Sequence, residues 1–321
     1  MYQKAYGIIE TLAPLHVGAS AGEETGNLNL IFRDQFTQTG IIPGSSIRGR
    51  FRADMREYNP QKCDFWYGRE AGDAPAGSRP KGDGQSPAFG ERDEKDQPIS
   101  TTEALVKFEY ASVVWLPVYC PNQPVVMVSC PLLLKRYHRM TGGKDSSNIQ
   151  PYMHSGINAQ KLFFNLGFIN LGEKADSQLS PYKKCAGALA QKYGFVVVND
   201  ADMPLIHDMS LYRQSRVKLK EDEKIVDDKA FFNVEALPEK TILVFPLALR
   251  RHYGEQDPKE QNKKIKKDVK WDDYIQDSDW QVANDNPPSK SHNIKPKEFY
   301  FGGLESIGFG RTEITLHHLP D

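Results

Sequence analysis

The chain turns and opens a helix at Ile41-Ile42-Pro43-Gly44-Ser45-Ser46-Ile47-Arg48-Gly49-Arg50-Phe51-Arg52, and the rest of the fold is organised around this stretch. Gly44 supplies the conformational freedom of the turn, and the hydroxyl of Ser45 or Ser46 can cap the first free N–H groups. A helix start offers unpaired N–H groups and a positive dipole end, and three arginines follow within five residues. The stretch therefore predicts an anion site, with a phosphate backbone as the best-fitting anion. An ordinary surface helix with a solvated basic face is the alternative.

The pattern of apolar residues predicts an α+β fold around an antiparallel sheet. Ile47, Phe51 and Met55 recur at helical spacing, so we expect the helix to continue to about Tyr58. The chain begins and ends with β-rich runs, which is typical of this fold class. Strands are expected at 5–12, 30–32, 105–119, 125–130, 195–198, 215–220, 241–249 and 312–316, helices from Pro131 and over 183–192, a helix cap at Asp200, and a loop or hairpin tip at 230–238.

Charge and cysteine content limit the classes of function. The 321 residues carry 41 basic and 42 acidic side chains, so any contact with nucleic acid must use a local patch. None of the four cysteines sits in a CxxC pair, which argues against a zinc ribbon. The sequence contains no signal peptide and no run long enough for a membrane helix. We expect a cytoplasmic protein with reduced thiols and no membrane partner.

Two polar stretches interrupt the pattern. The segment 68–102 is dense in Gly, Pro, Ser, Asp and Lys, and we expect a mobile insertion or linker there. The segment 253–297 is a second polar insertion, with six lysines between Lys259 and Lys270. Such a lysine run predicts a solvated helix or a disordered arm, and a contact with nucleic acid or a partner is the alternative.

A second glycine-rich element lies near the end of the chain, at Phe301–Arg311. Its glycines would let the backbone approach a ligand closely and present N–H groups to it. It is neither a P-loop nor a dinucleotide-binding fingerprint, because no Gly-Lys-Ser/Thr and no helix follow it. His16 stands alone after the first strand. A lone histidine is more often a hydrogen-bonded structural residue than a catalyst, although a loop position favours function. Ser45 lacks the His and Asp partners of a hydrolase.

These residues together resemble a known family. The chain resembles the RAMP-superfamily backbone subunit that repeats along the guide RNA in type III CRISPR effector complexes, with the Cmr-type form closest. The segments that carry the resemblance are Leu15-His16-Val17-Gly18, Arg33-Asp34 with Thr39-Gly40, Ile42 to Gly49, Leu116-Pro117-Val118, Val128 to Leu132, Arg216-Val217, Ala230 to Asn233, Leu237-Pro238 and Gly302-Gly303 to Gly310.

The resemblance implies a ferredoxin-like, RRM-related core in a single RAMP domain over 1–321. Insertions are expected at about 68–102, 142–180, 217–238 and 253–297, and the third of these would be a thumb hairpin that flips a base out of the guide–target duplex. Copies of the subunit would stack along CRISPR guide RNA, bind target single-stranded RNA and contact other subunits. The implied RNA-binding residues are Gly18, Arg33, Gly44, Ser45, Ser46, Arg48, Gly49, Arg50, Arg52, Arg216, Lys218, Gly302, Gly303, Gly308, Gly310 and Arg311.

The resemblance also raises the question of RNA cleavage. Active members cut target RNA with an Asp in the loop before the position of Arg33, and this sequence has Leu28 there, between Asn27 and Asn29. Leu can neither bind a metal nor accept a proton. A shifted loop could bring in Glu23 or Glu24, with magnesium or another divalent metal, and His16 and Glu235 match positions near the cut site.

Three functions therefore remain open from the sequence. An RNA-binding scaffold, which needs no cofactor and has no metal site, is favoured over a metal-dependent endoribonuclease that cuts at intervals of about six nucleotides, a period that the resemblance suggests. A small-molecule enzyme that uses the glycine loop is the third, and no catalytic constellation supports it.

Overall fold

The computed structural model describes residues 2–18, 28–69, 103–143, 148–165, 167–219, 226–256, 264–282 and 294–319. Its centre is a βαββαβ unit in which neighbouring strands are antiparallel and lie in the order β17-β1-β13-β5. This is the ferredoxin-like arrangement, because each helix connects two parallel strands that have a third strand between them. The unit consists of β1 (Tyr2–Thr11), α1 (Gly44–Tyr58), β5 (Ala111–Cys120), β13 (Ile242–Arg250), α7 (Trp271–Asp277) and β17 (Arg311–His318). The expected α+β fold is confirmed.

The sheet extends beyond this unit at both edges. On one side β16 pairs with β17, and on the other β6, β10 and β7 follow β5. β6 and β10 are parallel, with α3 in the connection between them, so the sheet is mixed. The added elements are β3 (Ile41–Ile42), β4 (Val106–Phe108), β6 (Gln123–Ser129), α3 (Pro131–Met140), β7 (His154–Ser155), β10 (Gly194–Val197) and β16 (Lys297–Tyr300).

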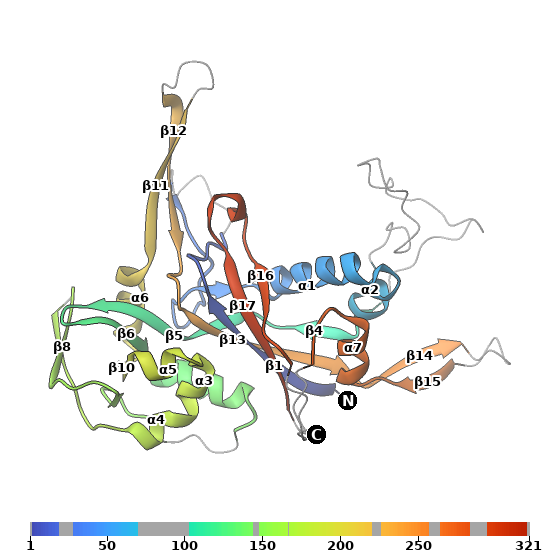
Figure 1. Ribbon diagram of the computed structural model, residues 1–321, viewed down its shortest axis with the longest axis horizontal. Coiled ribbons are helices and arrows are strands. Elements are labelled where there is room, and N and C mark those ends of the chain that lie inside the picture. Colours follow the sequence, from blue (N-terminus) through green and yellow to red (C-terminus); the bar gives the residue numbers. More distant parts are fainter. Residues whose placement is uncertain are drawn as a thin grey trace.

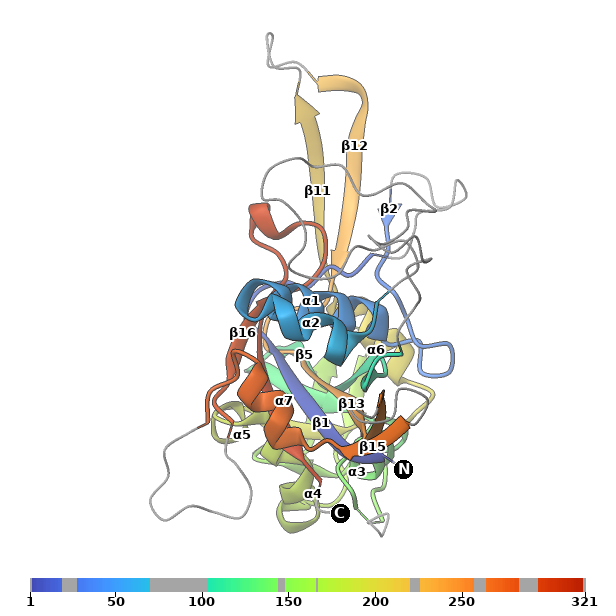
Figure 2. The same ribbon diagram turned by 90° about the vertical axis from the view of Figure 1, so that its right-hand side faces the viewer.

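Helices cover both faces of the sheet (Figures 1 and 2). On one face the ring of Phe51 in α1 stacks on Phe299 at 5.0 Å and meets the edge of Phe245 at 6.1 Å, beside α2 (Pro60–Tyr67) and α7. On the other face Trp115 packs edge-on against Phe195 at 4.8 Å. The second face is covered by α3, α4 (Asp176–Lys183), the 3₁₀ turn Lys184–Ala186 and α5 (Leu189–Lys192). The alternation of β1 and β13 side chains between these two cores fixes the register.

A long hairpin projects from the body of the molecule (Figure 1). It is formed by β11 (Tyr212–Leu219) and β12 (Val226–Ala236), which pair antiparallel from Tyr212 and Ala236 outward. The short β2 (Leu28–Asn29) pairs parallel with β12 at its base. The prediction of a loop or tip at 230–238 is therefore wrong over most of that range, because these residues supply the second strand of the hairpin.

The second polar stretch contributes to the core, contrary to the sequence interpretation. It contains the hairpin β14 (His252–Gln256) and β15 (Lys264–Asp268), so the described part of its lysine run is strand and not helix. It also contains α7, which buries Trp271, Tyr274 and Ile275 at helical spacing. The hydroxyl of Tyr274 lies 2.7 Å from that of Tyr67, which joins α7 to α2. The first polar stretch lies outside the described residues from 70 to 102.

Further elements complete the structure. β8 (Lys161–Phe164) and β9 (Gly167–Asn170) form a separate hairpin, and α6 (Met203–Ser210) precedes β11. Asp200 does not cap α6, because Asp202 occupies the N-cap position of that helix. The carboxylate of Asp200 instead accepts the N–H of Leu132, in the first turn of α3, at 2.8 Å. Within the described residues, no helix is long and apolar enough to cross a membrane.

Candidate nucleic-acid interface

The start of α1 presents free backbone N–H groups. Pro43 occupies the N-cap position and its carbonyl accepts the N–H groups of Ser46 and Ile47 at 3.0 and 3.2 Å. The predicted capping by a serine side chain is wrong, because both serines already lie inside the first turn. The N–H groups of Gly44 and Ser45 have no acceptor among the described residues. The first turn therefore retains donors for an anion, as the sequence predicts.

The three arginines of this stretch do not form one patch. A guanidinium nitrogen of Arg48 donates to the carbonyl of Tyr67 at 2.6 Å, and Arg52 lies 3.8 Å from the carboxylate of Asp64. Both side chains therefore hold α2 against α1, whereas Arg50 is exposed. The cause is helical geometry, because residues four apart share a face and the residue midway between them lies on the opposite side.

The glycine loop packs on the segment around His16. Gly302 has φ +95°, and a Cβ there would lie 2.1 Å from the carbonyl oxygen of His16. The N–H of Gly310 donates to the carbonyl of Pro14 at 2.8 Å. The imidazole Nδ1–H of His16 donates to the backbone carbonyl of Glu235 at 2.6 Å, which defines its tautomer. His16 thus connects the glycine loop to the base of the β11–β12 hairpin.

Backbone pairing joins this layer to α1. The N–H of Phe32 donates to the carbonyl of Val17 at 3.0 Å, and that of Ile41 donates to the carbonyl of Phe32 at 2.9 Å. Gly40 donates its N–H to Nε2 of His207, a fully buried side chain of α6, at 2.9 Å. The glycine loop, the His16 segment and the start of α1 therefore belong to one hydrogen-bonded surface.

A cluster of four charges lies at the base of the hairpin. Glu235 is 2% exposed, and its carboxylate accepts hydrogen bonds from Arg33 and Arg213 at 3.0 Å each. Both arginines also bind Asp208 of α6, at 3.0 and 3.1 Å. Partial burial alone would raise the pKa of Asp208, but the two guanidinium groups hold it below its ordinary value. Sequence inspection did not find Asp208 or Arg213, since long stretches of chain separate them from Arg33.

The remaining predicted site residues fall into three groups. Glu23 and Glu24 lie outside the described residues, and so do the side chains of Leu28, Arg216 and Lys218, whose backbones belong to β2 and β11. Arg311 forms a bidentate pair with Glu298 at 2.9 and 2.7 Å. A Cβ at Gly49, Gly303 or Gly308 would meet open space, while one at Gly18 would lie 2.7 Å from Nε2 of His16.

The described residues do not fit a divalent metal. They contain no group of three or more His, Cys, Asp or Glu side chains placed to hold one. The buried carboxylate of Glu235, whose backbone carbonyl accepts the His16 hydrogen bond, is already bound by two guanidinium groups. We therefore derive no step through a metal from these residues.

Fold and site together define a ferredoxin-like α+β protein with a projecting hairpin and a helix start whose first N–H groups are free. The model of the RAMP superfamily matches residues 8–313, and the chain belongs to that superfamily.

Solved structures share this fold. A Type III-B Cmr-beta structure bound to cognate target RNA superposes with a TM-score of 0.62 at 16% identity, covering 98% of this chain and 96% of the other. The apo state of Cmr-beta superposes with a TM-score of 0.60 at 17% identity, covering 99% of this chain and 98% of the other. Oligomeric Cmr4 from Pyrococcus furiosus superposes with a TM-score of 0.59 at 15% identity, covering all of both chains. No curated protein matches the sequence.

Proposed function

We propose that this chain is a repeated backbone subunit of a type III CRISPR effector ribonucleoprotein. It binds the phosphate backbone of guide CRISPR RNA, polymerises along it with copies of itself and other subunits, and positions target single-stranded RNA for antiviral defence in the cytoplasm. Membership of the RAMP superfamily supports this proposal. So does the fold shared with Cmr-beta, whose structure includes target RNA, and with Cmr4, whose crystal structure is oligomeric.

The observation that carries the proposal is the surface that begins at α1. It combines the two unpaired N–H groups of Gly44 and Ser45 with the exposed cation of Arg50. Backbone donors at a helix start bind phosphate without reading the base, and a guide-binding protein requires this because guide sequences vary. The net charge of −1 makes such a local patch necessary.

The projection of the β11–β12 hairpin supports a thumb role for it. It projects from the body beside this surface, and the Arg33–Glu235–Arg213–Asp208 cluster anchors its base. We assign it the role of a wedge that flips a base out of the guide–target duplex. A wedge needs a rigid base, and a buried carboxylate held by two guanidinium groups supplies one.

Replacement of Arg50 by Ala tests the phosphate site. We expect weaker binding to single-stranded RNA of every sequence, with the slope of log affinity against log salt concentration reduced by about 0.7. Arg56→Ala is the matched control, since it removes an exposed arginine from the last turn of the same helix. Equal binding by the wild type and Arg50→Ala would contradict the proposed site. Arg48→Ala removes the hydrogen bond to the carbonyl of Tyr67, so any effect of this variant on binding is attributed to folding and is checked by a parallel measurement of stability.

A metal-dependent endoribonuclease is the second candidate function. Both ends of the segment that carries Glu23 and Glu24 are held by backbone pairing: Gly18 forms an isolated bridge with Ile31, and Leu28 pairs with Asn233 of β12. Either glutamate could therefore replace the Asp that active members have at the position of Leu28.

The assembled complex on complementary RNA with magnesium tests this candidate. Cuts spaced by about six nucleotides, the period that the family resemblance suggests, would support it; Glu23→Gln or Glu24→Gln should then stop the cutting while RNA binding stays unchanged. If the wild-type complex makes no cuts, the endoribonuclease function is refuted and the scaffold function remains.

A further inference from the structure

A phenyl ring stands out from a rigid turn before α1. Phe36 is 87% exposed, the highest fraction among the large hydrophobic side chains that the structure describes. The carboxylate of Asp34 fixes the turn beneath it, because it accepts the N–H groups of Phe36 and Thr37, both at 2.9 Å. The same carboxylate accepts the hydroxyl of Tyr110 at 2.8 Å, and the N–H of Gln38 donates to the carbonyl of Asp34 at 2.9 Å. An aromatic side chain held outward in this way loses little conformational entropy when it binds.

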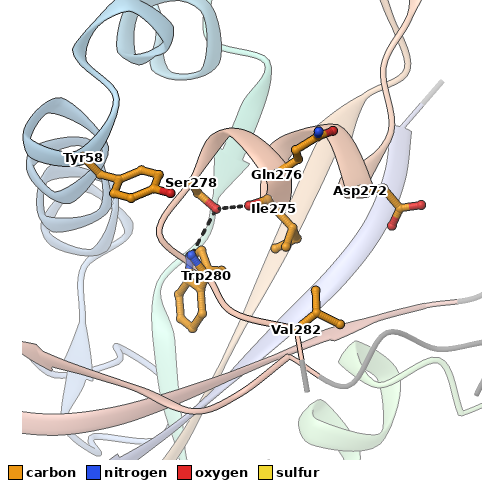
Figure 3. Close-up of a pocket in the computed structure, with 7 residues that line it drawn as sticks. All are labelled: Tyr58, Asp272, Ile275, Gln276, Ser278, Trp280 and Val282. Carbon is orange, nitrogen blue, oxygen red and sulfur yellow. Dashed lines mark hydrogen bonds between the residues drawn. The ribbon is translucent and has the colours of Figure 1, made fainter. Parts of the chain in front are cut away.

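A pocket lies at the other end of α1 (Figure 3). It has a volume of about 330 Å³ and lies between the last residue of α1, Tyr58, and the segment from α7 to Val282. Tyr58, Ile275, Trp280 and Val282 supply apolar surface, and Asp272, Gln276 and Ser278 supply polar groups. Trp280 and Ile275 are themselves almost fully buried, so the pocket has a firm floor.

The turn and the pocket lie towards opposite ends of α1. The turn belongs to the segment 28–43 at the left of Figure 1, whereas α7 lies at the right. The 15 residues of α1 between them span about 22 Å. Two complementary features at opposite ends of one element cannot satisfy each other within a chain, but they can between identical chains arranged head to tail. Head-to-tail contacts of this kind generate open filaments when the rotation between copies does not close a ring.

We propose that Phe36 of one copy of this chain inserts into the Tyr58–Trp280 pocket of the next copy. This inference rests on the proposed function, to which it adds the residues of the contact between copies. The pocket volume accommodates a phenyl ring, and burial of an aromatic side chain removes about 150–250 Å² from water. That area is far below a stable interface of about 1,200 Å², so this contact sets the register of copies that a shared RNA strand also holds.

The composition of the turn favours a protein partner over an RNA base. Aromatic platforms for single-stranded RNA lie in positively charged grooves. The turn Asp34-Gln35-Phe36-Thr37-Gln38 contains no cation, and the neighbouring Arg33 is bound to Glu235 and Asp208. The one charged side chain of the turn, Asp34, is bound by the N–H groups of Phe36 and Thr37 and by the hydroxyl of Tyr110.

A complementation experiment tests the contact. Phe36→Ala removes the ring, and Val282→Glu places a carboxylate at the apolar mouth of the pocket. Native mass spectrometry counts copies on a long single-stranded RNA, and binding to an oligonucleotide that holds one copy is measured in parallel. We expect each variant alone to add second and later copies roughly 10- to 100-fold more weakly than the wild type, with unchanged binding to the short oligonucleotide. A 1:1 mixture of the two variants should restore pairs of copies but not arrays of three or more. The Val282→Glu protein supplies an intact ring and the Phe36→Ala protein an intact pocket, and each can make only one such contact.

Two controls distinguish a contact between copies from an RNA-binding role of the ring. Phe168→Ala removes a ring that is 72% exposed on the β8–β9 hairpin and should leave assembly unchanged. Loss of affinity for the short oligonucleotide in Phe36→Ala would assign the ring to RNA and overturn the proposal. Unchanged assembly of both variants, or a mixture that forms no pairs, would also overturn it. Failure of the wild type to bind either RNA would instead refute the proposed function.

Discussion

His207 should make the stability of this protein sensitive to acid. Its side chain is fully buried in α6, and Nε2 accepts the N–H of Gly40 at 2.9 Å, so the proton of the neutral ring is on Nδ1. Burial first, and then the nearby charges of Arg33 and Arg213, lower the pKa of His207 from 6.5 to about 3, against the opposing effect of Asp208. The folded protein therefore keeps this ring neutral at a pH where the unfolded chain protonates it.

The direction and size of the effect follow from this pKa. Between pH 6.5 and 3 the unfolded state binds more protons than the folded state, so the free energy of unfolding falls as the pH falls. With these two pKa values the ring lowers that free energy by about 2 kcal/mol at pH 5 relative to pH 8. Protonation of Nε2 also removes the acceptor of Gly40, which lies directly before β3 and the start of α1.

Urea unfolding at pH 5, 6, 7 and 8 measures this contribution. All four tryptophans of the chain are buried and report unfolding by fluorescence. His207→Gln is the informative variant, since its amide oxygen can accept the Gly40 N–H and does not titrate. Other histidines with a lowered pKa, His154 and His317, are common to both proteins and cancel in the difference. Equal pH dependence in the wild type and His207→Gln would refute the reasoning.

Two further predictions concern stability. Gly302→Ala should lower the free energy of unfolding by about 1–3 kcal/mol, because the residue has positive φ and its Cβ would clash with the His16 carbonyl; Gly303→Ala, with open space around it, should have little effect. Asp200→Ala should cost about 1 kcal/mol through the lost acceptor of the Leu132 N–H, and Asp200→Asn should restore most of it. Urea unfolding checks both pairs, and equal values within either pair would contradict the assigned contact.

Local patterns predicted the central elements, whereas long-range contacts were out of reach. The spacing of Ile47, Phe51 and Met55 correctly predicted α1, and these side chains are its buried residues. The core role of α7 was missed because Trp271, Tyr274 and Ile275 occupy a short stretch beside a lysine run, whose composition dominates the interpretation. Contacts such as that of His207 with Gly40 join segments 167 residues apart, and a single sequence contains no local signal for them.

The three arginines of α1 have different roles in the structure, and this bears on the proposed phosphate site. The sequence predicts a phosphate site that combines the free N–H groups of the helix start with three arginines, but the structure uses Arg48 and Arg52 to attach α2. The proposed phosphate site at α1 then consists of backbone N–H groups and Arg50, donors that are insensitive to base identity. Glu235 is likewise committed to two arginines, so its contribution is the orientation of the hairpin. If the chain binds RNA as proposed, the described residues offer free N–H groups and an exposed arginine for that purpose, and the proposed cutting function rests on Glu23 or Glu24.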